Sequence, residues 1–170
     1  FPPGTSDEPL TVSQSLPGID GVVIVTTPQE IALLDSRKSI NFAKTISVPV
    51  LGVIENMSGY TIRGTAEANT RISVMGPSGI PLECETDGEG NWALTLDVFK
   101  SGGGEASAND LDVPFLGSLP FDPGIVRGGD DGVHRIVSEP DGETAQAFDS
   151  IVARITEELE GGSGPSLRIT

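Results

Sequence analysis

Cysteine and positive charge are the scarcest features of this 170-residue sequence. Cys84 is the single cysteine, which excludes an internal disulfide and any metal site built from paired thiolates of one chain. Lysine and arginine total 10 against 25 aspartate and glutamate residues, so the formal net charge is −15. Nucleic acids and anionic membranes bind clustered positive charge, and neither is therefore an expected partner.

Long hydrophobic runs are absent as well. No apolar stretch approaches the ~20 residues of a membrane-spanning helix, and the sequence shows no secretory signal pattern. The expected location is therefore cytoplasmic. The sequence opens on Phe1 without an initiator methionine, and we expect that residue 1 is not a natural start.

The most informative stretch that is present is 48–60, VPVLGVIENMSGY. Its apolar run predicts a strand buried on both faces of a parallel sheet. An earlier β-branched run at 21–26 precedes a helix start, in which Thr27 and Glu30 are expected to form a capping box. These features predict a βαβ unit over 21–55. Ligands of such folds bind beyond the carboxyl ends of the strands, which places residues 55–59 at the functional rim.

The same pattern resumes after residue 97, with a helix near 105–111, a third parallel strand at 115–119 and a helix over 143–159. Between the two parts, apolar residues recur with a period of two, which predicts an antiparallel meander of three strands. The alternating positions are Ile72 and Val74, then Ile80, Leu82 and Cys84, then Trp92, Leu94 and Leu96.

Five ordered blocks carry a family resemblance: FPPGTSD at 1–7, GVVIVTTPQE at 21–30, VPVLGVIENMSGY at 48–60, DVFKSGGGE at 97–105 and VPFLGSLPFDP at 113–123. Together they resemble the carboxyl-terminal half of the Mrp/ApbC family, iron–sulfur cluster carrier P-loop ATPases of the MinD/ParA group. The resemblance implies ATP and Mg²⁺ as family cofactors and an iron–sulfur cluster as the bound group. It also implies a homodimer that serves iron–sulfur apoprotein clients.

The fold class expected from this resemblance is α/β: a partial doubly wound parallel sheet without its phosphate-loop half, interrupted by a small antiparallel β insert. The expected domains are a discontinuous core of 1–61 and 97–160, an insert of 62–96 and a flexible tail of 161–170. The insert is similar to part of a bacterial immunoglobulin-like repeat.

The resemblance also implies site residues. Gly4 and Asp7 belong to a switch loop that senses the γ-phosphate in the family. Asn56 occupies the position that reads the adenine ring, and Pro120, Phe121 and Asp122 close on the same base. A strand-end residue that caps backbone groups is the alternative interpretation of Asn56, and a structural turn is the alternative for Asp122.

Two departures from the family pattern bear on activity. No Gly-Lys dipeptide occurs in the sequence, so ATP binding is expected to be weak or absent. The segment Ser101–Gly104 lacks that lysine and is expected to be a turn into a helix. The family's Cys-x-x-Cys pair is replaced by the insert, so cluster binding is expected to be lost. Cys84 is expected to be a buried structural thiol.

The sequence therefore predicts a fragment or variant of an ATP-dependent iron–sulfur carrier that is inactive alone, with no catalytic residue and no metal ligand of its own. The alternative is a non-enzymatic binding module, or a recombinant chimera, whose β insert makes protein–protein contacts. His134 has no accompanying Gly-x-Ser-x-Gly elbow, so a hydrolase triad is not expected. The segment 87–91 resembles a calcium loop only in its alternation and is expected to be a β-turn.

Overall fold

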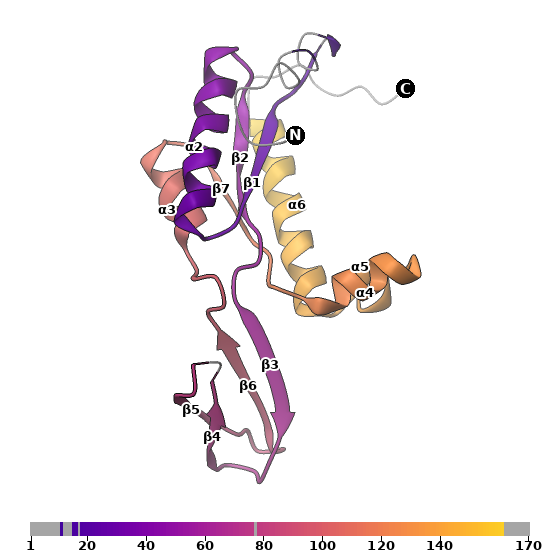
Figure 1. Ribbon diagram of the computed structural model, residues 1–170. Helices are drawn as coiled ribbons and strands as arrows, with labels where there is room; N and C mark the ends of the chain where they lie inside the picture. The colour runs from indigo at the N-terminus through magenta and orange to yellow at the C-terminus, as the bar shows by residue number, and fades with distance from the viewer. Residues whose placement is uncertain (1–10, 12–14, 17, 77, 162–170) are drawn as a thin grey trace.

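The computed structural model describes residues 11, 15–16, 18–76 and 78–161. A three-stranded parallel sheet with strand order β1-β2-β7 forms the core, and a long β arm projects from one end of it (Figure 1). The strands are β1 (Val22–Thr26), β2 (Val50–Glu55), β3 (Tyr60–Thr65), β4 (Arg71–Met75), β5 (Pro81–Glu85), β6 (Asn91–Leu96) and β7 (Phe115–Ser118). The helices are α2 (Glu30–Thr45), α3 (Gly103–Asp110), α4 (Pro123–Asp131), α5 (Arg135–Ser138) and α6 (Glu143–Gly161).

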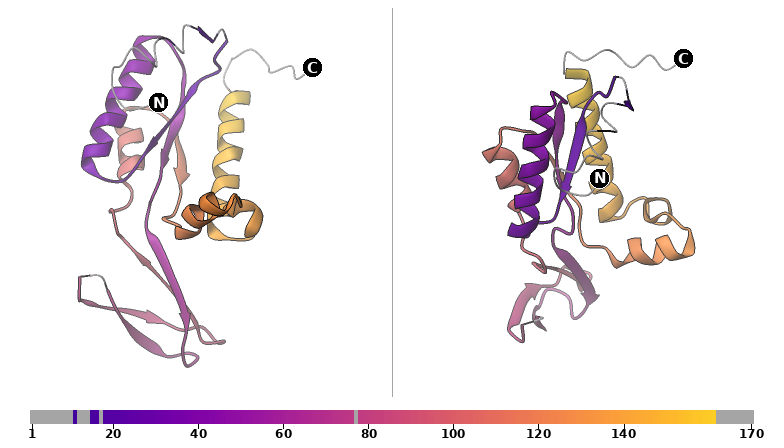
Figure 2. Two further views of the ribbon diagram at one scale, coloured as in Figure 1. Left: turned by 45° about the vertical axis from the view of Figure 1, so that its right-hand side comes forward. Right: turned by 45° about the horizontal axis from the view of Figure 1, so that its top comes forward.

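Strand β2 lies at the centre of the parallel sheet, as its apolar sequence predicts. Helices α2 and α3 cover one face of the sheet and α6 covers the other (Figure 2). On the first face Val53 packs with Ile40 and Ala108, and on the second Ile54 packs with Ile151. The alternate side chains of one strand therefore enter two separate cores, which confirms the predicted α/β fold. None of the helices in the described ranges is long and apolar enough to span a membrane.

The helix boundaries differ from the sequence expectation at two places. Helix α2 begins at Glu30 with Gln29 as its N-cap and no side-chain cap, so the predicted capping box is wrong. The Thr27 hydroxyl instead contacts the Gln29 side chain at 3.1 Å. Helices α4 and α5 were not expected, because the glycines within α4 lower its intrinsic helix propensity. Asp122 at its N-cap and Pro123 in its first turn compensate for them.

The arm is one long hairpin, not the predicted three-stranded meander. Strand β3 pairs with β6, from Tyr60↔Leu96 to Thr65↔Asn91, and β4 pairs with β5, from Arg71↔Glu85 to Met75↔Pro81. The residue numbers of every pair add up to the same total, so the two ribbons share one register across the interruption at 66–70 and 86–90. The meander prediction failed because the sequence reading overlooked β3, which takes β6 as its partner.

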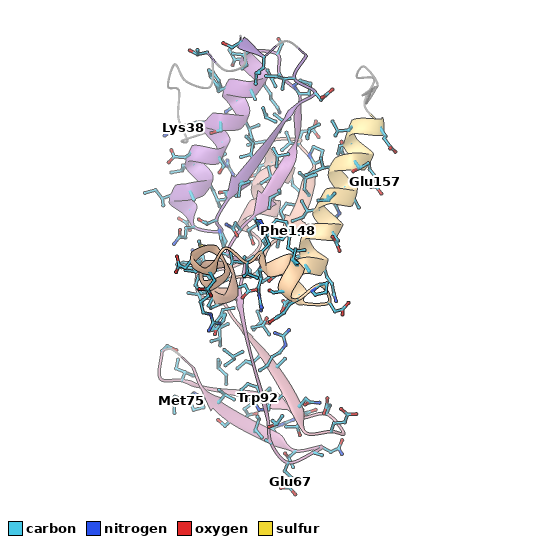
Figure 3. The ribbon with its side chains drawn as sticks, turned by 90° about the vertical axis from the view of Figure 1, so that its right-hand side faces the viewer. Lys38, Glu67, Met75, Trp92, Phe148 and Glu157 are labelled. Atoms are coloured by element: carbon cyan, nitrogen blue, oxygen red, sulfur yellow. The ribbon has the colours of Figure 1, made fainter. Side chains whose placement is uncertain are left out.

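The arm bends at the interruption, so that β4 and β5 turn back beside β6 (Figure 1). Figure 3 shows Glu67 at the bend and Met75 near the far end of the second ribbon. The Thr86 hydroxyl donates to the Glu67 carbonyl at 2.6 Å across the bend. The predicted turn at 87–91 is confirmed: hydrogen bonds from the side chain and amide of Asn91 and from the amide of Glu89 lower the pKa of the Asp87 carboxyl.

One face of the arm is apolar. Its half-buried side chains come from both ribbons: Ile62, Trp92 and Leu94 from the first, and Ile72, Val74, Leu82 and Cys84 from the second. Cys84 thus lies on the apolar face, as its position in the alternating pattern predicts, but it is half-buried and not fully buried. The second ribbon's opposite face carries Arg71, which pairs with Glu85 at 3.1 Å.

Candidate nucleotide rim and arm base

The carboxyl ends of the three parallel strands form a rim. At this rim the segments that follow β2 and β7 lie side by side. Three backbone hydrogen bonds join the two exits. The Leu119 amide donates to the Glu55 carbonyl (2.7 Å), the Ser58 amide to the Leu119 carbonyl (2.9 Å) and the Phe121 amide to the Gly59 carbonyl (2.8 Å). Residues 55–60 and 118–121 therefore act as one rigid edge from which the arm begins.

Glu55, the last residue of β2, is fully buried at 0% exposure. Its carboxylate accepts hydrogen bonds from the Ser58 hydroxyl (2.6 Å), the Gly102 amide (3.0 Å) and the Gly104 amide (2.6 Å). The two amides belong to the start of α3, where the helix dipole favours a negative charge. Since no cation pairs with this carboxylate within the described residues, backbone dipoles supply its stabilisation. Glu55 thereby ties together the segment that enters the arm and the segment that leaves it.

The glycine-rich segment 101–104 is a turn into a helix, as expected, and its amides bind a carboxylate of the same chain. Gly102 has a φ of 79°, a conformation that favours glycine. A Cβ atom on Gly104 would lie 2.9 Å from the Cβ of Glu55, so the close approach of α3 to β2 depends on the missing side chain. The turn and the buried glutamate are therefore parts of one structure.

Asn56 lies at the rim directly after β2, half-buried. Its backbone amide donates to the Thr26 carbonyl at 2.7 Å, and its side-chain Oδ1 accepts from the Met57 amide at 2.9 Å. Met57 has a φ of 60°, an unfavourable value for a residue with a side chain. The local capping role that the sequence left open for Asn56 is therefore present. Its side-chain nitrogen has no partner among the described residues, and it remains able to donate.

The segment Pro120–Asp122 lies next to the Asn56 turn, because Leu119 bonds to both Glu55 and Ser58. The Phe121 ring packs edge-on against Tyr60 and Phe99, with centroid distances of 5.7 and 6.1 Å. The structure thus brings Asn56 and Pro120 together at the rim. Gly4 and Asp7, the other two expected site residues, lie outside the described residues.

Asp122 has a structural role. Its side chain is 14% exposed and accepts hydrogen bonds from the Gly124 amide (2.7 Å), Arg135 Nε (2.8 Å) and the Thr144 hydroxyl (2.7 Å). Burial acts to raise the pKa of this carboxyl, but the bonds from Arg135, Thr144 and Gly124 outweigh it and lower the pKa. Asp122 therefore caps α4 and joins α4, α5 and α6.

A groove of about 740 Å³ separates the base of the arm from α4. Three arginines line it, namely Arg63 from β3, Arg127 from α4 and Arg135 from α5. Arg63 pairs with Glu143 at 2.8 Å. Sequence reasoning missed all three, since they lie far apart in the chain and follow no motif that would have indicated a common site.

The described residues include no group of three or more histidine, cysteine, aspartate or glutamate side chains that could hold a metal ion. Cys84 lies on the arm opposite Ile72, away from the rim. We therefore assign no chemical step to Mg²⁺ or to an iron–sulfur cluster.

The parallel sheet with helices on both faces is the fold of MinD-type P-loop NTPases. The structure matches MinD from Pyrococcus furiosus with a TM-score of 0.57 and 20% identity, covering 91% of this chain and 48% of that one. It matches Pyrococcus horikoshii MinD, solved with Mg-ADP, with a TM-score of 0.57 and 22% identity, covering 93% of this chain and 48% of that one. These matches define the fold.

The chain belongs to the ParA family of NUBPL iron-transfer P-loop NTPases, because the family model matches residues 1–80 and 83–156. Its sequence is 38% identical over 160 residues to the iron-sulfur cluster carrier protein of Methanocaldococcus jannaschii, covering 94% of this chain and 45% of the relative. It is also 38% identical over 155 residues to that of Synechocystis, covering 91% and 36%.

The chain thus spans less than half the length of these curated relatives. The family match continues through most of the arm. The immunoglobulin-like resemblance of residues 62–96 finds no support in the comparisons, and the arm's long hairpin has the pairing described above.

Proposed function

We propose that this chain forms the base-side wall of the nucleotide site in an ATP-dependent iron–sulfur cluster carrier. The observation that carries the proposal is its 38% identity, over 94% of the chain, to a protein named as an iron–sulfur cluster carrier. The geometry of the rim is compatible with this role. Asn56 and Pro120 lie together beyond the carboxyl ends of β2 and β7, where ligands of parallel sheets bind.

In this proposal Asn56 reads the adenine ring. An asparagine side chain offers one acceptor and two donors, and it pairs with the N6 amino group and N7 of adenine. The Met57 amide uses one lone pair of Asn56 Oδ1. The second lone pair and the side-chain nitrogen are the groups that would meet the base. The Met57 contact fixes the orientation of the side chain, so less conformational entropy is lost on binding.

Pro120 and Phe121 form the neighbouring wall, and Asp122 acts by holding them in place. The three hydrogen bonds of Asp122 occupy its carboxylate, which favours this indirect role over a direct nucleotide contact. Gly4 and Asp7 complete the proposal as the switch loop that senses the γ-phosphate. Because the 170 residues contain no Gly-Lys dipeptide, we expect them to hold the phosphates poorly.

The cluster is the cargo in this proposal. We propose a homodimer that delivers it to apoprotein clients, in line with the family's description as iron-transfer proteins. A bridging [4Fe–4S] cluster takes four thiolates, and Cys84 would supply two per dimer. We therefore propose that these 170 residues contribute the nucleotide side and do not ligate the cargo.

Titration with Mg-ATP, followed by backbone amide NMR, tests the nucleotide role. We expect a dissociation constant weaker than about 1 mM, with shifted amide signals at Asn56, Met57 and Phe121. Asn56→Ala should abolish the shifts. Asn41→Ala, which removes an exposed amide from α2, is the matched control and should leave them unchanged. Micromolar binding that survives Asn56→Ala would contradict the proposal, as would shifts confined to other surfaces.

A further inference from the structure

Strand β3 has an open edge. Among the described strands it pairs with β6 alone, in a two-stranded sheet. The Ala66 amide donates to the Gly90 carbonyl at 2.8 Å, which places residues 60, 62, 64 and 66 in the hydrogen-bonded positions of the ladder. By the alternation of antiparallel pairing, the backbone N–H and C=O groups of Thr61 and Arg63 therefore point away from β6. No strand in the part of the chain that the structure describes pairs with these donors and acceptors.

This edge is one wall of the 740 Å³ groove at the base of the arm. Thr61 and Arg63 line the groove from β3, and Val126 and Arg127 line it from α4. The Val126 side chain is 65% exposed, so the wall opposite the strand offers apolar surface. Pro120 and Phe121 line the groove as well, so it adjoins the proposed base-side wall, whereas Asn56 is not among its lining residues.

The charge of the groove differs from that of the whole chain. Its lining carries Arg63, Arg127 and Arg135 against Asp122 and Glu143, a net charge of +1 on a chain whose net charge is −15. Arg63 and Arg135 are already paired with Glu143 and Asp122. Arg127 is exposed and has no carboxylate partner in the part of the chain that the structure describes. One guanidinium is therefore available to an incoming carboxylate.

We propose that the open edge of β3 binds an extended acidic segment of a partner protein as an added strand. Backbone hydrogen bonds to Thr61 and Arg63 supply the pairing, as in other β-strand additions. An acidic side chain of the partner meets Arg127 with charge-assisted hydrogen bonds, and an aliphatic side chain next to it covers Val126. A peptide backbone fits this edge, whereas the phosphates of a nucleic acid would meet the strongly negative surface of the remaining chain.

A fluorescein-labelled peptide of alternating valine and glutamate residues, measured by fluorescence anisotropy with the 170-residue chain, tests this inference. Thr61→Pro removes an outward N–H from the groove edge. Its matched control is Thr95→Pro, which removes the outward N–H of the paired residue on the other edge of the ribbon. Both changes delete the same 3.1 Å Thr61–Thr95 hydroxyl contact. Thr61→Pro also deletes the 3.4 Å hydrogen bond from the Thr61 hydroxyl to Glu143, so Thr61→Val, which loses the hydroxyl and keeps the N–H, is the second control and should bind the peptide like the unchanged chain. Far-ultraviolet circular dichroism verifies that both variants are folded.

We expect Thr61→Pro to weaken peptide binding about tenfold, the effect of one lost hydrogen bond in a paired strand, and Thr95→Pro to leave it unchanged. Arg127→Gln should also weaken binding about tenfold, whereas Arg154→Gln, which changes an exposed arginine of α6 outside the groove lining, should not. A peptide with N-methylated alternate amides should not bind.

Equal effects of the two proline variants would overturn the proposal, and so would binding of the N-methylated peptide. Displacement of the peptide by Mg-ATP would assign the groove to the nucleotide. A dimer of the chain that Thr61→Pro converts to a monomer would assign the edge to a second copy. Either result would also overturn the proposal, and neither depends on whether Asn56 reads adenine.

Discussion

Glu55→Gln is the substitution by which the structure of the rim is most directly tested. The change keeps the shape of the side chain and replaces one carboxylate oxygen by an NH₂ group. Oε1 accepts from the Ser58 hydroxyl and the Gly102 amide, and Oε2 accepts from the Gly104 amide. Because all the partners around the carboxylate donate, the new NH₂ group faces an N–H in either orientation of the amide.

Of the two orientations of the new amide, the one that points its NH₂ group toward the Gly104 amide loses fewer hydrogen bonds. One hydrogen bond to a charged group is then lost, about 1.5–3 kcal/mol, and two buried N–H donors face each other without an acceptor, about 1–3 kcal/mol more. We expect the free energy of unfolding to fall by about 3–5 kcal/mol. With a urea m-value of about 2 kcal/mol/M, the midpoint should move down by about 1.5–2.5 M.

Urea unfolding followed by far-ultraviolet circular dichroism measures this shift. Glu105→Gln is the matched control: it removes a glutamate from the first turn of the same helix, but an exposed one, so only about 0.3–1 kcal/mol of dipole interaction is at stake. A midpoint for Glu55→Gln within about 0.5 M of the control, roughly 1 kcal/mol, would refute the view that buried backbone amides hold this carboxylate.

Further predictions concern the acid response, the arm and the cargo. Asp122→Asn should be less stable than the unchanged chain at pH 7. Folding lowers the pKa of the Asp122 carboxyl, so its contribution to stability is fully present above the unfolded pKa of about 4 and is lost as the pH falls through the folded pKa. The difference in melting temperature between the two proteins should therefore shrink below about pH 4. A difference that stays constant with pH would contradict this prediction. The single tryptophan, Trp92, reports on the arm, and circular dichroism reports on the helices. We expect the two signals to melt at different temperatures, and a short Gly-Ser linker in place of residues 62–96 should preserve the helical transition; coincident melting with loss of helix on excision would show one cooperative unit. Anaerobic reconstitution with iron and sulfide should give no stable cluster, and charge-transfer absorption that Cys84→Ser abolishes would count against this.

The parallel core was predictable because its signals are local. The apolar run of β2 identifies a buried strand, and the helix-boundary residues around α2 identify a helix, each within a single stretch of sequence. The wrong prediction at Thr27 also came from a local pattern: the capping-box residues are present, but the helix begins at Glu30, two residues later than expected.

The site was less accessible, because its contacts join residues that are distant in sequence. Glu55 meets Gly102 and Gly104 only once the arm between them has closed. A glutamate at the end of an apolar run gives no sign that it will be fully buried. The pairing of β3 with β6 was not predicted for a similar reason, since alternation of apolar residues identifies strands but does not specify their partners. Asn56 and Pro120–Asp122 came from the family resemblance, not from pattern.

The shared register of the arm has a consequence for how its length can vary. Removing one residue from each strand keeps every pair matched but turns all side chains beyond that point to the opposite face. Removing two from each strand keeps both the pairs and the faces, and it shortens the ribbon by about 7 Å. The reach of the arm can therefore change in increments of about 7 Å while Glu55, its amide partners and the parallel sheet stay as they are.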